Sequence, residues 1–203
     1  MKEEKLDKLT IFGIACLIFV IAGLFGFIYE FIFYYLNSGM KTFYYRGANF
    51  IPWINIYATG SLMIYLLTRK LKDKPLLVFL ISFLSCGILE LISGYLVFEF
   101  TDGARYWDYN TEIWNFGNIG GFVCLRSAAF FGVSGLILMY ILIPFAKYIA
   151  RITPRKVFLI ITITLAGLVL ADELYNLIVA RVFSLPRAHD VYQHFGFKYM
   201  KYK

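Results

Sequence analysis

The sequence is poor in charge, proline and histidine. Only 16% of its 203 residues are charged, five are proline and two are histidine, whereas a soluble domain usually has about 25% charged residues. No stretch is long and polar enough for a separate soluble domain. The sequence also lacks a glycine-rich phosphate loop followed by Lys-Ser or Lys-Thr. These absences argue against a nucleotide-binding domain within this chain.

Residues that often carry chemistry are scarce as well. The three cysteines, Cys16, Cys86 and Cys124, fall within apolar segments without metal-ligand or redox spacing, so we expect small buried side chains. His189 and His194 are five residues apart, which does not place them on one helical face, and no metal site is predicted. No Ser-His-Asp or Cys-His pattern occurs within the apolar segments. With no recognisable catalytic motif, the sequence leaves enzymatic activity open and indicates no particular cofactor.

Long apolar runs are abundant. The chain is 60% hydrophobic and 20% aromatic, and apolar runs of about 20 residues recur along it. We therefore predict an all-α polytopic membrane protein that forms a single domain over residues 1–203. Five transmembrane helices are predicted, at about residues 9–36, 53–68, 76–98, 120–146 and 157–183. The second is short for a full span, so we expect part of the preceding loop to enter the membrane.

Basic residues give the chain a net charge of +7, and they gather beside the apolar runs. The two clearest clusters lie at residues 69–74 and 147–156. Topology and lipid head groups explain such clusters better than nucleic acid does. The excess of positive charge on one side predicts a multi-pass protein of the plasma membrane, with a cytoplasmic N-terminus and a C-terminus outside.

Five charged residues fall inside the predicted helices: Glu30, Glu90, Arg126, Asp172 and Glu173. An intramembrane charge costs several kcal/mol unless it finds a partner, so we expect Arg126 to pair with at least one of the four acids. Full ionisation would leave three uncompensated negative charges. Either some acids are protonated or a cation binds among them. A structural ion-pair network is one interpretation, and a functional site is the one that we prefer.

The candidate substrate-binding site includes polar neighbours of these charges. Asn176 lies one helical turn after Asp172, and Asp108 between Trp107 and Tyr109 is placed to line an entrance. The residues predicted to bind substrate are Glu30, Glu90, Arg126, Asp172, Glu173, Asn176, Asn55, Trp107 and Asp108. The aromatic residues are interpreted most simply as a belt at the outer membrane interface. That belt would comprise Trp53, Tyr106, Trp107, Tyr109 and Trp114.

A weak internal repeat is visible around two of the glutamates. Glu30 and Glu90 are each followed by isoleucine at +2, tyrosine at +5 and leucine at +6. Glu173 occupies a comparable place in the fifth predicted helix. The pattern predicts a parallel duplication of a two-helix unit plus half of a third, as in some transporter folds. Chance matching of apolar residues is the alternative.

Several short motifs carry a resemblance to a known family. They are Gly26-Phe27-Ile28-Tyr29-Glu30, Arg46-Gly47, Pro52, Ile56-Tyr57-Ala58-Thr59-Gly60, Glu90-Leu91-Ile92-Ser93-Gly94, Glu99, Trp107-Asp108-Tyr109, Asn118, and Gly121-Phe122-Val123-Cys124-Leu125. With these the chain resembles the CmpB-like Putative ABC-transporter type IV family, and the resemblance implies a transporter permease of the bacterial inner membrane. Arg126 and Asn55 depart from the family's pattern.

The leading hypothesis is a permease-like membrane protein that binds and transports a small polar or charged substrate or a cation through the carboxylate and arginine site. One alternative is an intramembrane enzyme that acts on a lipid-linked substrate, with a carboxylate as general base. Another is an accessory subunit of a membrane complex. We expect membrane lipids and a small-molecule or cation substrate as partners and no nucleic acid. A homo-oligomer and a separate partner subunit both stay open.

Overall fold

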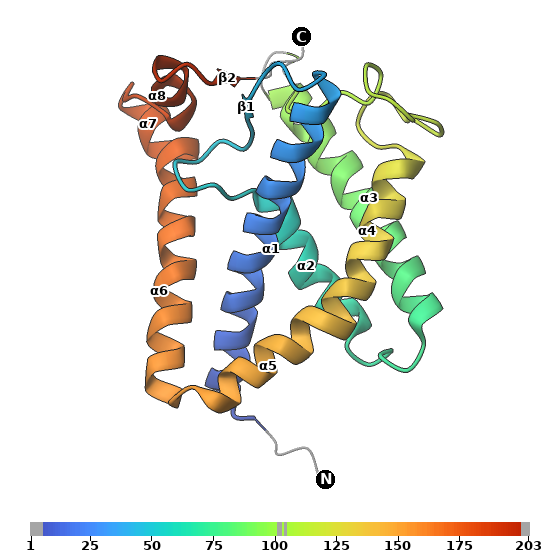
Figure 1. The fold of residues 1–203 in the computed structure, drawn as a ribbon, viewed down its shortest axis with the longest axis vertical. Helices are drawn as coiled ribbons and strands as arrows, with labels where there is room; N and C mark the ends of the chain where they lie inside the picture. The colour runs from blue at the N-terminus through green and yellow to red at the C-terminus, as the bar shows by residue number, and fades with distance from the viewer. Residues whose placement is uncertain (1–5, 101–102, 104, 200–203) are drawn as a thin grey trace. The chain divides into compact units, whose positions relative to one another are not determined.

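The computed structural model describes residues 6–100, 103 and 105–199, and it confirms an all-α membrane protein. The helices are α1 (Lys8–Asn37), α2 (Asn55–Thr68), α3 (Pro75–Phe100), α4 (Leu125–Ile137), η1 (Leu138–Leu142), α5 (Ile143–Ile152), α6 (Arg155–Leu174), η2 (Tyr175–Val179), α7 (Ala180–Val182) and α8 (Ala188–His194). Two short strands, β1 (Tyr44–Tyr45) and β2 (Lys198–Tyr199), pair in parallel. Figure 1 shows these elements along the chain.

Four helical stretches are long and apolar enough to cross a membrane: Lys8–Asn37, Pro75–Phe100, Leu125–Ile152 and Arg155–Val182. They correspond to the first, third, fourth and fifth predicted helices. The second predicted helix is α2, which has only 14 residues. The prediction that the fourth helix begins at residue 120 was wrong. Gly120 and Gly121 have φ of 60° and 81°, a left-handed conformation that a helix does not accommodate.

The contacts between residues divide the chain into two compact units. The first unit comprises residues 1–59 and 143–199, and the second consists mainly of residues 60–142. The single domain that we expect from the sequence stays a prediction.

In the first unit, α1 and α6 run in the same direction (Figure 1). At one end Asp7 caps α1 by accepting hydrogen bonds from the backbone of Leu9 and Thr10, and it pairs with Arg155 at the start of α6. At the other end β1, which follows α1, pairs with β2 near the end of the described chain.

That preceding segment, residues 43–54, lies against α1 and is called the strap below. It runs backwards along the helix: Phe43 stacks on Tyr35 at a centroid distance of 4.5 Å, and the amide of Ile54 donates to the carbonyl of Gly23 at 3.1 Å. Gly23 makes this approach possible, since a Cβ there would lie 2.0 Å from Nε1 of Trp53. Part of the loop therefore lies alongside α1, and its entry into the membrane, which the shortness of the second helix suggested, stays a prediction.

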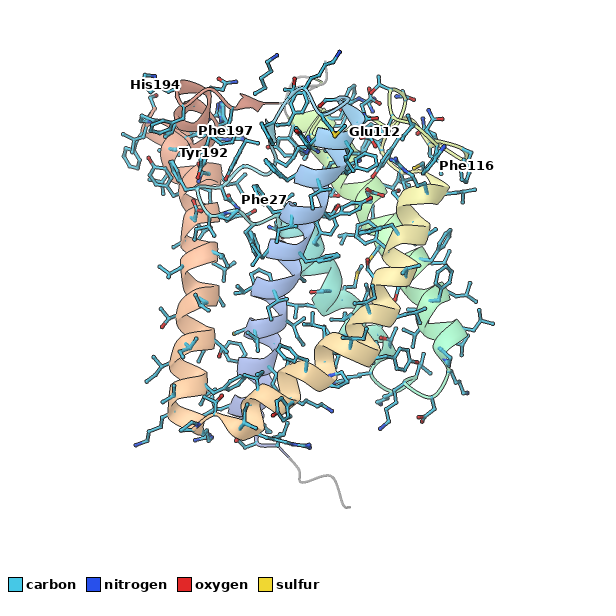
Figure 2. All side chains as sticks on the ribbon, in the orientation of Figure 1. Phe27, Glu112, Phe116, Tyr192, His194 and Phe197 are labelled. Atoms are coloured by element: carbon cyan, nitrogen blue, oxygen red, sulfur yellow. The ribbon has the colours of Figure 1, made fainter. Side chains whose placement is uncertain are left out.

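Aromatic rings from the C-terminal segment fasten the strap at the β1 end of the first unit. Tyr45 stacks on Tyr192 of α8 at 4.0 Å and meets Phe27 and Phe197 at 5.5 Å and 6.4 Å between centroids. Three of these residues are labelled in Figure 2. The strap is thus packed between α1 and the chain that follows α6.

In the second unit, α3 packs against α4, and residues 101–124 connect them. Small residues line the contact: a Cβ at Gly87 would lie 3.5 Å from the Cβ of Ala128, and one at Gly135 would clash with Ser82. Cys86 and Cys124 are both 1% exposed, and Cys16 of the first unit is 8% exposed. All three are free thiols, so the expectation of small buried side chains is confirmed.

Candidate functional site

Glu30 of α1 forms a buried ion pair in the first unit. Nε of Arg46, from the strap, lies 2.7 Å from Oε2 of Glu30, and the hydroxyl of Tyr57 donates to Oε1 at 3.1 Å. The side chains of Arg46 and Glu30 are only 7% and 16% exposed. The guanidinium also lies 4.1 Å from the centre of the Tyr34 ring, a cation–π contact. Arg46 therefore compensates Glu30.

Asp172 of α6 holds the backbone of the strap. Its two carboxylate oxygens accept hydrogen bonds from the amides of Phe50 and Ile51 at 3.1 Å and 2.6 Å, and Nδ2 of Asn176 donates to Oδ1 at 2.8 Å. Irregular backbone at membrane depth needs such partners, because no water is there to satisfy its amides. Asp172 supplies them across 122 residues of sequence.

Glu173, the next residue, binds side-chain amides. Nδ2 of Asn49 donates to Oε2 at 3.2 Å, and Nδ2 of Asn55 donates to Oε1 at 2.7 Å. Asn55 in turn accepts the hydroxyl of Thr59 on its Oδ1 atom. Asn55 and Thr59 are exposed and Glu173 is half-buried, so this triplet forms a polar edge. We call Asn55, Thr59 and Glu173 the polar edge below.

The polar edge lies deep along the helices of its unit. Asn55 follows Ile54, whose amide bonds to Gly23, the 16th residue of the 30-residue α1. Glu173 is 18 residues after Arg155, about 27 Å along α6 at 1.5 Å per residue. Polar groups at such a depth are costly beside lipid, and they usually line a pathway or face a partner.

A π-helical turn, η2, begins at Tyr175, two residues after Glu173. Its second residue, Asn176, is 4% exposed and accepts the amide of Ala188 at 2.7 Å on Oδ1. Because Asn176 also donates to Asp172, it links the strap-binding carboxylate to the start of α8. Single π-turns of this kind are frequent at functional sites.

Glu90 of α3 is a buried acid of the second unit, with 5% of the residue exposed. Tyr109, from the connecting loop, donates its hydroxyl to Oε1, and Ser127 of α4 donates to Oε2 at 2.7 Å. Ser127 also accepts the amide of Cys124 at 3.2 Å, which closes the N-terminal cap of α4. The carboxylate thus ties the loop and the start of α4 to α3.

Arg126 pairs with Glu112 of the connecting loop, and the distance between NH2 and Oε2 is 2.6 Å. The side chain of Glu112 is 3% exposed, so this pair is also shielded. Glu112 is labelled in Figure 2. The sequence pattern gave no reason to select Glu112, because the residue lies outside every predicted helix.

Trp107 and Asp108 organise the connecting loop. The indole N–H of Trp107 donates to the carbonyl of Phe122 at 2.8 Å. Asp108 accepts the backbone and side-chain amides of Asn110 at 3.0 Å and 2.7 Å, and NH1 of Arg105 is 3.7 Å away. Both side chains are used within the loop, and Asp108 is only 8% exposed.

The predicted aromatic belt was wrong for two residues. Trp53 is 1% exposed and Tyr109 is 8% exposed, so neither faces lipid. Trp53 packs against Gly23 and donates to the carbonyl of Phe19 at 3.3 Å. Trp114, in contrast, is 70% exposed. The missing side chain at Gly23 leaves room for the indole to pack inward, which the belt interpretation did not consider.

The predicted site residues fall into two groups. Glu30, Asn55, Asp172, Glu173 and Asn176 belong to the first unit, where the strap connects them. Glu90, Trp107, Asp108 and Arg126 belong to the second unit. Residues that sequence reasoning missed include Arg46, Asn49, Tyr57, Tyr109, Glu112 and Ser127. Within the described ranges, no group of three or more His, Cys, Asp or Glu residues is placed to hold a metal ion.

Comparison with protein families gives one finding. The family model described as "Putative ABC-transporter type IV" matches residues 17–177. The matched range includes all nine predicted site residues and the whole strap. Comparisons with curated proteins and with solved structures give no match.

Proposed function

Because the chain belongs to the Putative ABC-transporter type IV family, we propose that it is a permease-like protein that binds and transports a small polar or charged solute, with a cation favoured. The polar edge of the first unit supports this proposal most directly. It combines an acid, an amide and a hydroxyl at the depth of the middle of α1. We further propose the bacterial inner membrane, with the N-terminus in the cytoplasm.

The negative charge of Asp172 and Glu173 favours a cation as the substrate. Asp172 and Glu173 are adjacent acids, and their hydrogen bonds come from amide groups. Among the described residues, no basic side chain forms a salt bridge with either acid. Two carboxylates in a medium of low dielectric need a proton or a cation to be neutralised. The side-chain oxygens of the polar edge, on Glu173, Asn55 and Thr59, are suitable to bind a proton or a cation.

The cluster also has a means of coupling binding to movement. Asp172 holds the strap through two backbone amides, and Glu173 holds it through Asn49. A cation that draws Glu173 away from Asn49 or Asn55 changes how the strap is attached to α6. The π-turn that begins two residues after Glu173 is a place where a helix can shift its register.

Flux through vesicles tests this function. The full-length protein would be reconstituted into liposomes with a trapped pH-sensitive dye and imposed sodium, potassium or proton gradients. Glu173→Gln should slow cation-dependent flux about tenfold or more, because an interaction with a charged group is worth ~1.5–3 kcal/mol. Asp73→Asn, a matched change in an exposed turn, should leave the flux unchanged. Equal rates for the wild type and Glu173→Gln would contradict the proposal.

A second candidate function is that of an accessory subunit in a membrane complex. One observation favours it: these 203 residues contain no phosphate loop, so any ATP hydrolysis would have to take place outside them. In that case a partner helix covers the polar edge. A photo-crosslinker placed at Asn55 would then capture a membrane protein of defined mass, and the liposomes would show no flux.

A further inference from the structure

Helix α5 differs from the other apolar helices of the first unit in its direction. Figure 1 shows it lying obliquely at the end where α1 and α6 begin. The stretch Leu125–Leu142, which precedes it, has 18 residues and is about 27 Å long. That length already approaches the ~30 Å thickness of the hydrocarbon core. Helix α5 is therefore not needed to complete the crossing.

The side chains of α5 form three stripes. The stripe that faces the protein consists of Ile143, Ala146 and Ala150, all buried. A second stripe is apolar yet exposed: Phe145 is 51% exposed, and Tyr148 and Ile152 are each 58% exposed. These three residues are spaced at i, i+3 and i+7, which is the spacing of one helical face.

The third stripe is basic. Lys147 and Arg151 are four residues apart, so they lie on one face of α5 between the other two stripes. The next turn adds Arg155 and Lys156, and the sequence contains no Asp or Glu from residue 113 to residue 171. Asp7 pairs with Arg155, and residues 147–156 together contain four basic residues and no acid.

We propose that α5 is an interfacial helix that binds the head groups of anionic phospholipids. Lys147 and Arg151 contact the phosphates, while Phe145, Tyr148 and Ile152 insert at the boundary with the acyl chains. A short helix with an exposed apolar face beside a basic face is the arrangement that binds a membrane surface. Charge complementarity selects anionic lipid over zwitterionic lipid.

Lipid retention tests the proposal. The full-length protein would be purified in micelles that contain equal amounts of phosphatidylcholine and phosphatidylglycerol with the same acyl chains. Native mass spectrometry would then count the lipids that remain bound. The wild type should retain phosphatidylglycerol preferentially. The double variant Lys147→Ala/Arg151→Ala should reduce this preference on the order of tenfold, since each basic residue near an anionic surface contributes a factor of about five.

Two controls separate this site from a general effect of charge or folding. Lys70→Ala/Lys72→Ala removes the same charge from the other basic turn and should keep the preference. Lys147→Arg/Arg151→Lys should keep it as well, which shows that the helix tolerates substitution. Phe145→Ser/Tyr148→Ser should lower retention without a change of charge. An equal loss in the control at positions 70 and 72, or no loss in the variant at positions 147 and 151, would overturn the proposal.

Discussion

Glu30 belongs to the first unit and Glu90 to the second, and the two glutamates are stabilised by different chemistry. Each lies on a long apolar helix, and each accepts hydrogen bonds from the segment and the helix that follow in the chain. Arg46 brings a positive charge to Glu30, whereas Tyr109 and Ser127 bring hydroxyl groups to Glu90. The comparison shows that an acid on a long apolar helix can be accommodated either by a cation or by hydroxyl donors.

The difference has an energetic consequence. An ion pair that is shielded from water depends on both partners, because loss of one leaves a buried charge. A carboxylate with two hydroxyl donors keeps one donor when the other is removed. We therefore expect the first unit to be more sensitive than the second to the loss of a single partner of its glutamate.

The largest effect should follow Arg46→Leu. Removing the guanidinium leaves Glu30 shielded without its cation, which typically costs ~3–5 kcal/mol. Thermal unfolding in mild detergent measures the loss. The double variant Arg46→Leu/Glu30→Gln should be less destabilised than the sum of its two single variants, because the residues touch. Additive losses would mean that the pair contributes nothing as a unit.

The next largest effect compares how closely neighbouring side chains approach a glycine on α1 and a glycine on α3. In the first unit, Gly23→Ala places a Cβ 2.0 Å from the indole of Trp53, which is 1% exposed and has no room to move. Overpacking of this kind should cost ~1–3 kcal/mol. In the second unit, Gly87→Ala places a Cβ 3.5 Å from Ala128, an ordinary contact. That variant should unfold at or above the temperature of the wild type, and a fall equal to that of Gly23→Ala would remove the contrast.

A smaller effect should follow Tyr109→Phe, which removes one of two hydroxyl donors to Glu90. We expect a loss of about 1 kcal/mol, the net worth of one hydrogen bond. Tyr95→Phe removes the hydroxyl of a tyrosine that lies on the same helix as Glu90 and is 51% exposed, and it should be neutral. If Tyr109→Phe costs as much as Arg46→Leu in the same unfolding assay, the two glutamates do not differ as we describe.

The smallest effect concerns the ion pair of Asp7 and Arg155. This pair is exposed, so it shows what an ion pair contributes without burial. Hydrogen bonds from Arg155 and Thr10 lower the pKa of Asp7 below its usual value of 3.8. The folded state therefore gains stability from ionised Asp7 above pH 3.8, and the gain disappears as the pH falls through the lowered pKa. Asp7→Asn should lower the unfolding temperature slightly at neutral pH and leave it unchanged in strong acid. A constant difference across this range would refute the linkage.

The long helices were predictable because each is a long run of apolar residues. The sequence does not show in the same way where the loops lie relative to the helices. The bounds of α1 and α3 agree with the prediction to within two residues. The start of α4 did not, because residues 120–124 are apolar enough to resemble a helix although two glycines turn the chain there. Only the shortness of α2 suggested that the strap packs along α1.

The candidate site was predictable in its acids and unpredictable in their partners. Intramembrane carboxylates stand out in an apolar sequence, so Glu30, Glu90 and Glu173 were identified from composition alone. Arg46 and Glu112 lie in loops that look solvated, and only the folded chain brings them against their partners. Contacts such as that between Asp172 and Phe50 span 122 residues, a distance over which a single sequence gives no pairing signal.

The attachment of the strap to Asp172 also constrains how the protein is made. The amides of Phe50 and Ile51 emerge from the ribosome 122 and 121 residues before the carboxylate that binds them. At a synthesis rate of about 5–20 residues per second, that interval lasts roughly 6–24 s. During this time the amides of Phe50 and Ile51 have no acceptor from α6, although the partners of the strap on α1 have already been made. The strap can therefore pack against α1 early in biogenesis, and its attachment to α6 is completed only when α6 has been made.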